Sequence, residues 1–259
     1  MTSKNVETVF FDLDDTLLGN NMEHFLPRYF ALLGEYARPI FADRDQLLQE
    51  LLHGTQAMIA NPDPGRTNRE KFWRTFSERT GVAREEAEPF FNRFYEEEFP
   101  KLQAVTERKP VARDLVCACF ERGLQVAIAT NPLFPRRAIE HRLAWAGLPP
   151  AEFDFALVTS YENMHAAKPH AAYYREILTR VGAQPETTLM VGDHWENDIA
   201  PAAALGMRTY WIAPEGAELP APLVEEGLLI GAGSLETFHR WLFGEQGAAS
   251  PNAATDGAS

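Results

Sequence analysis

Cysteine and long apolar runs are both scarce in this chain of 259 residues. Cys117 and Cys119 are its only cysteines, and in an apolar helical pattern residues two apart point to different faces. This disfavours a disulfide or a metal pair, and we expect both thiols to pack in the core. The longest apolar runs, such as residues 126–129, are too short to cross a bilayer, and residues 1–7 lack an apolar signal core. We therefore expect a cytoplasmic protein that does not enter a membrane.

Positive charge is also in deficit. The chain has 24 Lys and Arg residues against 37 Asp and Glu residues, which gives a formal net charge of −13. This balance argues against a nucleic-acid partner, because binding to a phosphate backbone needs clustered basic residues. It does not exclude a small phosphorylated substrate, since a bound metal ion can dominate the local field. The 45% apolar and 24% charged content is ordinary for a globular enzyme.

Short β-rich segments alternate with segments of helical periodicity. The predicted strands are Thr8–Phe11, Gln125–Ala129, Phe155–Thr159, Thr188–Val191 and Arg208–Ile212. The predicted helices between and after the later strands are Pro110–Glu121, Arg136–Ala146, Ala171–Val181 and Trp195–Ala204. This alternation predicts right-handed βαβ units in an α/β fold with a doubly wound, mostly parallel sheet. Ligands bind such sheets beyond the carboxyl ends of the strands.

A stretch of about ninety residues follows the first strand and interrupts this alternation of strands and helices. Its pattern is almost wholly helical. Apolar positions three and four apart predict helices at Met22–Tyr36, Asp43–Met58, Arg69–Arg79 and Arg84–Glu98. We predict an α/β core of residues 1–18 and 105–243, with residues 19–104 inserted as a helical cap domain. The segment 244–259 has almost no bulky apolar residues, so we expect a disordered tail.

A pair of carboxylates, Asp12 and Asp14, directly follows the first strand. Residues two apart in an extended chain share a face, so both side chains can address one substrate atom. Phosphoryl transfer needs a nucleophile in line with the leaving oxygen and a proton donor for that oxygen. Two carboxylates with these roles need different environments, and a divalent cation beside one of them provides the difference. Taken alone, the pattern fits a turn at a strand end equally well.

Neutral and positive groups follow later in the chain. Thr130 and Asn131 come directly after a strand and offer donors for phosphate oxygens, although Thr130 alone fits a capped turn at least as well. Lys168 precedes a predicted helix, where its charge adds to the partial positive field of free N–H groups. Alone, it is more typical of a solvated surface lysine. Only the combination of these groups predicts a phosphate site.

The fourth element is a hydrophobic strand that ends at Gly192, followed by Asp193 and Asp198. Magnesium prefers oxygen ligands and keeps several waters, so one direct carboxylate and a second one linked through water fit this ion. Asp198 also fits an early-helix carboxylate that the helix dipole favours. That alternative explains Asp193 poorly.

In this order, the four elements resemble the motifs of the haloacid dehalogenase-like hydrolase superfamily. The resemblance covers the whole core: residues 12–16 are similar to the first motif, Thr130 to the second, Lys168 to the third, and residues 192–198 to the fourth. It implies a Rossmann-like core and Mg²⁺ as the cofactor.

The resemblance also implies catalytic and metal-binding roles. Asp12 is the expected nucleophile, which forms an aspartyl-phosphate, and it is also an expected magnesium ligand. Asp14 is the expected general acid and base, with its backbone carbonyl on the metal. Asp193 is expected to bind the metal directly, and Asp198 to support it through water or hydrogen bonds.

For the phosphoryl group, the resemblance implies that Thr130 and Lys168 hold its oxygens and that Lys168 also steadies Asp12. Asn131 is a weaker candidate for the same site. The backbone N–H groups of Leu13 and Asp14 are possible further donors.

Asp14 and the insert narrow the chemistry within the superfamily. The dehalogenases lack the second aspartate, and phosphonatase-type members depart from it and need a cap lysine. Here Asp14 can protonate a leaving alkoxide, which favours ester hydrolysis. The insert is similar to a C1-type cap, and a lid that closes over the site predicts a small substrate.

We therefore predict a magnesium-dependent hydrolase of small-molecule phosphate monoesters. A phosphomutase and a non-catalytic sensor of phosphorylated metabolites remain alternatives, and the sequence does not predict the oligomeric state. Each candidate for contact with the leaving group also fits a surface or packing role. These candidates are His24, Arg28, Arg66, Asn68, Arg69 and Trp73, whereas His165, His194 and Trp195 are candidates for lining the mouth of the site because they lie close in sequence to Lys168 and Asp193.

Overall fold

The computed structural model describes residues 6–60, 63–214 and 216–244. Its centre is a six-stranded sheet in the order β5-β4-β1-β6-β7-β8, and every neighbouring pair of strands is parallel. The strands are β1 (Thr8–Phe11), β4 (Gln125–Ile128), β5 (Leu157–Val158), β6 (Thr188–Gly192), β7 (Arg208–Ile212) and β8 (Leu229–Gly233). This arrangement confirms the predicted α/β fold with a parallel sheet.

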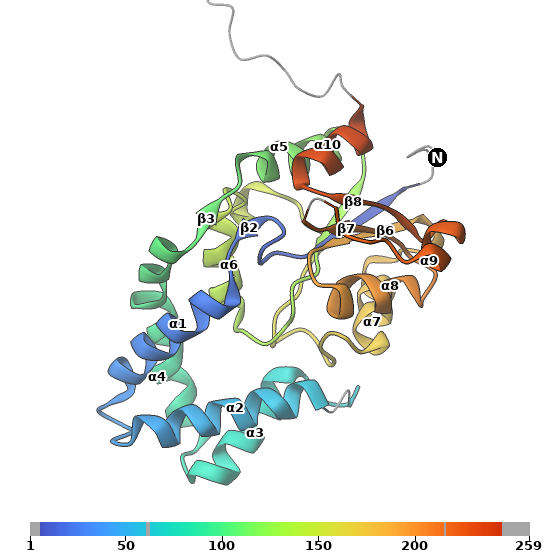
Figure 1. Ribbon diagram of the computed structural model, residues 1–259. Helices are drawn as coiled ribbons and strands as arrows, with labels where there is room; N and C mark the ends of the chain where they lie inside the picture. Colours follow the sequence, from blue (N-terminus) through green and yellow to red (C-terminus); the bar gives the residue numbers. More distant parts are fainter. Residues whose placement is uncertain (1–5, 61–62, 215, 245–259) are drawn as a thin grey trace, which may run out of the picture.

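Helices cover both faces of the sheet (Figure 1). The core helices are α5 (Pro110–Glu121), α6 (Arg136–Trp145), α7 (Ala171–Val181), α8 (Ala200–Ala203), α9 (Ala221–Glu225) and α10 (Leu235–Phe243). Alternate residues of a strand point to opposite faces. Val9 and Phe11 accordingly belong to one buried cluster together with residues of α5 and α10, whereas Phe10 belongs to a second cluster with residues of α7 and α8. Because both faces are buried, the central strands β1, β4 and β6 are apolar after their first residue.

Four helices form an insert in the sequence between β1 and β4, at the lower left of Figure 1. They are α1 (Met22–Ala37), α2 (Arg44–Ala60), α3 (Asn68–Thr80) and α4 (Arg84–Glu97), and a 3₁₀ segment at Phe99–Val105 follows them. We call α1–α4 the helical insert. Two short antiparallel strands, β2 (Leu18–Gly19) and β3 (Glu107–Arg108), pair at its base. The bounds of core and cap given above stay a prediction.

The ends of α3 illustrate how the sequence delimits these helices. Thr67 is the N-cap, and its hydroxyl accepts from the Glu70 N–H while the Glu70 carboxylate accepts from the Thr67 N–H. This reciprocal pair satisfies two N–H groups that the helix leaves free. At the other end, Gly81 adopts a φ of 73°, a conformation that is open to glycine and strained for other residues.

Several predicted elements differ from the observed ones. β5 has two residues instead of five, and the predicted helix Trp195–Ala204 is a π-helical turn at Trp195–Ile199 followed by α8. β8 and α10 were not predicted. Cys119 is buried, as expected, but Cys117 is only half-buried because it lies off the buried stripe of α5.

Two further expectations concern membrane spans and the C-terminal tail. In the described residues, no helix is both long enough and apolar enough to span a membrane. The predicted disordered tail lies, apart from Gly244, outside the described residues.

Candidate active site

The register of the sheet brings three predicted site residues together. β1 lies between β4 and β6, with Phe11 opposite both Ile128 and Val191. Asp12, Thr130 and Asp193 follow these strands within two residues, so they meet at one edge of the sheet. The Thr130 backbone carbonyl accepts from the Thr159 and Tyr173 hydroxyls at 2.6 and 2.8 Å, which fixes the loop that carries it.

A tight turn after β1 positions Asp14. The N–H groups of Leu17 and Leu18 both donate to the Leu13 carbonyl at 2.9 Å. Asp15 adopts a φ of 54°, and its carboxylate accepts from the Asn20 N–H at 2.9 Å. Asp and Asn are the residues other than glycine that best tolerate this conformation. The turn thereby returns the chain so that Asn20 lies beside Asp14.

Lys168 is buried between two carboxylates. Its ammonium lies 2.7 Å from Asp12 Oδ1 and 2.5 Å from Asp198 Oδ1. Burial alone would lower the pKa of Lys168, but these two carboxylates outweigh it and hold the pKa well above its usual value. Lys168 is therefore a permanent cation beside Asp12. Its backbone N–H donates to Asn131 Oδ1 at 3.3 Å, which links the two loops.

Asp12 and Asp193 resist ionisation. Burial raises the pKa of Asp12 to about 6, although Lys168 opposes the shift. Burial, followed by repulsion from Asp12 and Asp198, raises the pKa of Asp193 to about 7. Carboxylates held together in this way favour the arrival of a cation, because a cation stabilises their charged forms.

Asp198 is held against the end of β6 by its own hydrogen bonds. Oδ1 accepts from Lys168, and Oδ2 accepts from the His194 N–H at 3.0 Å. A Cβ atom on Gly192 would lie 2.4 Å from the Asp198 carboxyl carbon, so only glycine fits at this position. The π-helical turn at Trp195–Ile199 places Asp198 over Gly192. The sequence predicted a regular helix here and did not predict this contact.

These carboxylates fit a divalent metal. Asp12, Asp193 and Asp198 each offer an oxygen, and the three oxygens lie within 4.8 Å of one another. Both Asp198 oxygens already accept hydrogen bonds, which leaves Asp12 and Asp193 as the better direct ligands. Hard carboxylate oxygens in this number suit Mg²⁺, which keeps several waters.

Arg142 is a site residue that the sequence analysis missed. It is fully buried on α6 and forms an ion pair with Asp14, while its guanidinium lies 4.7 Å from the centre of the Phe134 ring. Asn20 Nδ2 donates to the other Asp14 oxygen at 2.7 Å. Burial raises the pKa of Asp14, and Arg142 opposes that shift. The available signal was an arginine within the apolar stripe of a predicted helix, next to Leu143 and four residues after Ala138.

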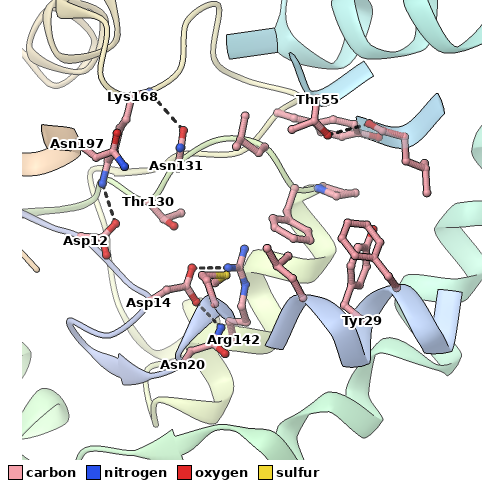
Figure 2. A pocket seen from close by; sticks show the side chains of 18 of the residues that line it. Asp12, Asp14, Asn20, Tyr29, Thr55, Thr130, Asn131, Arg142, Lys168 and Asn197 are labelled. Atoms are coloured by element: carbon pink, nitrogen blue, oxygen red, sulfur yellow. Dashed lines mark hydrogen bonds and ion pairs between the residues drawn. The ribbon is translucent and has the colours of Figure 1, made fainter. Parts of the chain in front are cut away.

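All seven predicted catalytic, phosphate-binding and metal-binding residues line one cavity of about 620 Å³ between the sheet edge and the helical insert. In Figure 2, Asp12, Asp14 and Thr130 lie on one side of this cavity, and Tyr29 and Thr55 of the insert lie across from them. Of the nine candidates for contact with the leaving group or for the mouth of the site, Trp73 and His194 line the cavity. The other seven are not among the described residues that line it, namely His24, Arg28, Arg66, Asn68, Arg69, His165 and Trp195.

Arg69 and Asn68, two of these seven, are held by structural partners. Arg69 pairs with Glu88, at 2.6 Å between Nε and Oε1. Asn68 is buried, and its Nδ2 donates to the Pro132 and Ala166 carbonyls at 3.3 and 3.0 Å. Asn68 thus fastens α3 to the two loops that carry Asn131 and Lys168.

Comparison with known proteins agrees with this geometry. The model of a hydrolase family described as haloacid dehalogenase-like hydrolase matches residues 6–206. The pyrophosphatase PpaX of Bacillus pumilus is 26% identical over 219 residues, which cover 82% of this chain and 86% of that protein. A phosphoserine phosphatase of Thermus thermophilus is 29% identical over 161 residues, which cover 61% of this chain and 59% of that protein.

Solved structures share the fold. The crystal structure of a HAD phosphatase from Thermococcus onnurineus superimposes with a TM-score of 0.56 at 19% identity, and the match covers 93% of this chain and 99% of that chain. At this level of identity the likeness shows the fold alone.

Proposed function

The chain belongs to the haloacid dehalogenase-like hydrolase family, and on that basis we propose that it is a magnesium-dependent phosphatase of small-molecule phosphate monoesters. The observation that carries this proposal is the site at the sheet edge. There, Asp12 lies against the buried cation Lys168, and Asp14 is held separately by Arg142 and Asn20. Two carboxylates in different environments suit the roles of nucleophile and general acid.

In the proposed first step, an Asp12 carboxylate oxygen attacks phosphorus and the bond to the ester oxygen breaks. The Asp14 carboxylic acid gives its proton to that oxygen, so that the leaving group departs as an alcohol. Lys168 and Thr130 hold the phosphoryl oxygens, with Asn131 as a weaker contributor. Bound Mg²⁺ would supply charge stabilisation and shield the anionic nucleophile from the phosphate.

In the second step, the ionised Asp14 takes a proton from water, and the water oxygen attacks phosphorus. The bond between phosphorus and Asp12 breaks, so that phosphate is released and the Asp12 carboxylate is restored. Arg142 and Asn20 orient Asp14 for both proton transfers. Asp193, with Asp198 behind it, would complete the oxygen ligands for the metal together with the Asp14 backbone carbonyl.

A phosphate-release screen over a metabolite panel with and without Mg²⁺ tests the proposal. We expect release that requires Mg²⁺ from at least one monoester. An isomerised ester without released phosphate would favour the phosphomutase. Binding without turnover would favour the sensor.

The expected cytoplasmic location stays a prediction.

We expect Mg²⁺ to stabilise the fold. A ligand present at a hundred times its dissociation constant adds about 2.7 kcal/mol. For a chain of this size, such a gain raises the melting temperature by about 5–10 °C. Thermal unfolding with and without MgCl₂ measures this change. The Asp193→Asn variant should lose most of the increase, whereas Asp154→Asn, an exposed loop position, should keep it. An equal increase in both variants would contradict the role given to Asp193.

We expect Arg142→Met to lower kcat about 10- to 100-fold with a smaller change in KM, because Asp14 loses one of its two anchors. Arg137→Met is the matched control, since Arg137 lies on the same helix but is exposed and pairs with Glu140. Steady-state kinetics of phosphate release compare the two variants. Equal losses would show that Arg142 does not position Asp14.

A further inference from the structure

The wall of the cavity opposite Asp12 is mostly apolar. The helical insert contributes, among others, Leu26, Phe30, Leu33, Phe72 and Trp73 to it. Tyr29 also lines the cavity, and its hydroxyl is already hydrogen bonded to that of Tyr95 at 2.8 Å. A group that fills this side of the cavity therefore meets carbon surfaces, and filling it with carbon removes apolar area from water.

The polar side chains of this wall are few, and they are either hydrogen bonded or exposed. Asn21 Oδ1 accepts from two backbone N–H groups of α1, and the Thr55 hydroxyl donates to the Leu51 carbonyl at 2.9 Å. Glu23 and Asn92 are exposed, so they lie toward solvent. Glu23 adds negative charge, which would repel a second anionic group on a substrate.

Positive charge is missing from the same wall. Among the described residues, the insert contributes no Lys, Arg or His to the cavity lining. The core contributes Lys168 and Arg142, whose charges are balanced by Asp12, Asp198 and Asp14, and an exposed His194. Burying a carboxylate or a second phosphate without a cation is costly. The buried Nη2 of Arg142 lacks a partner in the described chain, but it belongs to the guanidinium that is already ion-paired with Asp14.

We propose that the leaving group of the substrate is apolar: the enzyme prefers monoesters of an alkyl or aryl alcohol to esters that carry a second anion. This inference rests on the proposed phosphatase function and names its substrate class. It separates this chain from the chemistry in the names of the relatives above, since pyrophosphate bears a second phosphate and phosphoserine bears a carboxylate and an ammonium group. The 620 Å³ volume leaves room for such a group beside the phosphate.

A series of n-alkyl phosphates from ethyl to hexyl tests the inference, because the leaving alcohols differ mainly in apolar surface. With Mg²⁺, we expect kcat/KM to rise about two- to fourfold for each methylene group. We expect hexyl phosphate to exceed phosphoglycolate, phosphoserine and pyrophosphate by at least about tenfold. A flat series, or a higher kcat/KM for any of the three polyanionic or zwitterionic compounds, would overturn the proposal.

Two pairs of variants locate the effect. Phe30→Ala should reduce the gain per methylene group, whereas Phe90→Ala, also a half-buried phenylalanine of the insert but outside the lining, should not. Thr55→Lys should lower kcat/KM for hexyl phosphate about fivefold or more and raise it for phosphoglycolate, because it places an ammonium in the apolar wall. Gln56→Lys adds the same charge at the next, exposed position and should leave the ratio unchanged.

Binding separates this inference from the proposed function. Calorimetry with ethylphosphonate and hexylphosphonate in the presence of Mg²⁺ measures the same preference without turnover. Tighter binding of hexylphosphonate supports the apolar site even if no ester is hydrolysed, an outcome that would refute only the phosphatase proposal. Phosphate release that depends on Asp12, together with equal binding of both phosphonates, would refute only the apolar leaving group.

Discussion

The Asp12→Asn variant is expected to lose at least about 10⁴-fold in kcat for phosphate release, because its amide cannot form the aspartyl-phosphate. The substitution preserves the shape of the side chain, and Lys168 keeps its second carboxylate, Asp198, at 2.5 Å. We therefore expect the variant to stay folded, as circular dichroism would verify. Kinetics with an aryl phosphate and Mg²⁺ measure the loss.

Asp15→Asn is a matched control for this prediction, since Asp15 lies in the same turn. Asparagine tolerates its φ of 54° and can still accept from the Asn20 N–H. We expect this variant to lose less than about tenfold, because it keeps the turn that orients Asp14. Activity of Asp12→Asn within tenfold of the wild-type protein would remove Asp12 as the nucleophile.

The second large effect is expected for Asp14→Asn and depends on the leaving group. A general acid contributes about 10²- to 10⁴-fold when the leaving oxygen needs a proton, so an alkyl phosphate should lose activity in this range. Nitrophenolate leaves without a proton, so formation of the aspartyl-phosphate from nitrophenyl phosphate should suffer less. Water attack still lacks its base, and the covalent intermediate should accumulate.

Rapid mixing tests this prediction through a burst of nitrophenolate in Asp14→Asn, followed by slow turnover. The burst should approach one equivalent per site. Equal losses on alkyl and nitrophenyl phosphates without a burst would show that Asp14 does not transfer the proton. That result would leave Asp14 with an electrostatic or metal-binding role.

The sheet and the core of the site were accessible from the sequence because both follow from short-range patterns. An apolar strand followed at once by a polar residue fixes that residue at the carboxyl end of the strand. In a parallel sheet all such ends share one edge. Asp12, Thr130 and Asp193 could therefore be grouped without knowing the strand order. β8 escaped because its segment Leu229–Gly233 contains two glycines and is mostly half-exposed, which weakens the strand pattern.

The other parts of the site depend on contacts between distant residues. Arg142 and Asp14 are 128 residues apart in the sequence, and no local sequence pattern predicts their ion pair. The lining of the cavity by the insert was also hard to predict. Polar residues such as Arg28 and Arg69 were candidates for contact with the substrate because of their side-chain chemistry alone. Arg28 is exposed and Arg69 pairs with Glu88. The apolar side chains that line the cavity looked like ordinary helix-packing residues in the sequence.

The fastening of α3 by Asn68 restricts how the helical insert can move relative to the sheet. Any motion that lifts α3 from the loops of Asn131 and Lys168 must break the hydrogen bonds of Asn68 to the Pro132 and Ala166 carbonyls. Each such bond contributes about 0.5–1.5 kcal/mol, so together they favour the position of α3 in which Phe72 and Trp73 line the cavity.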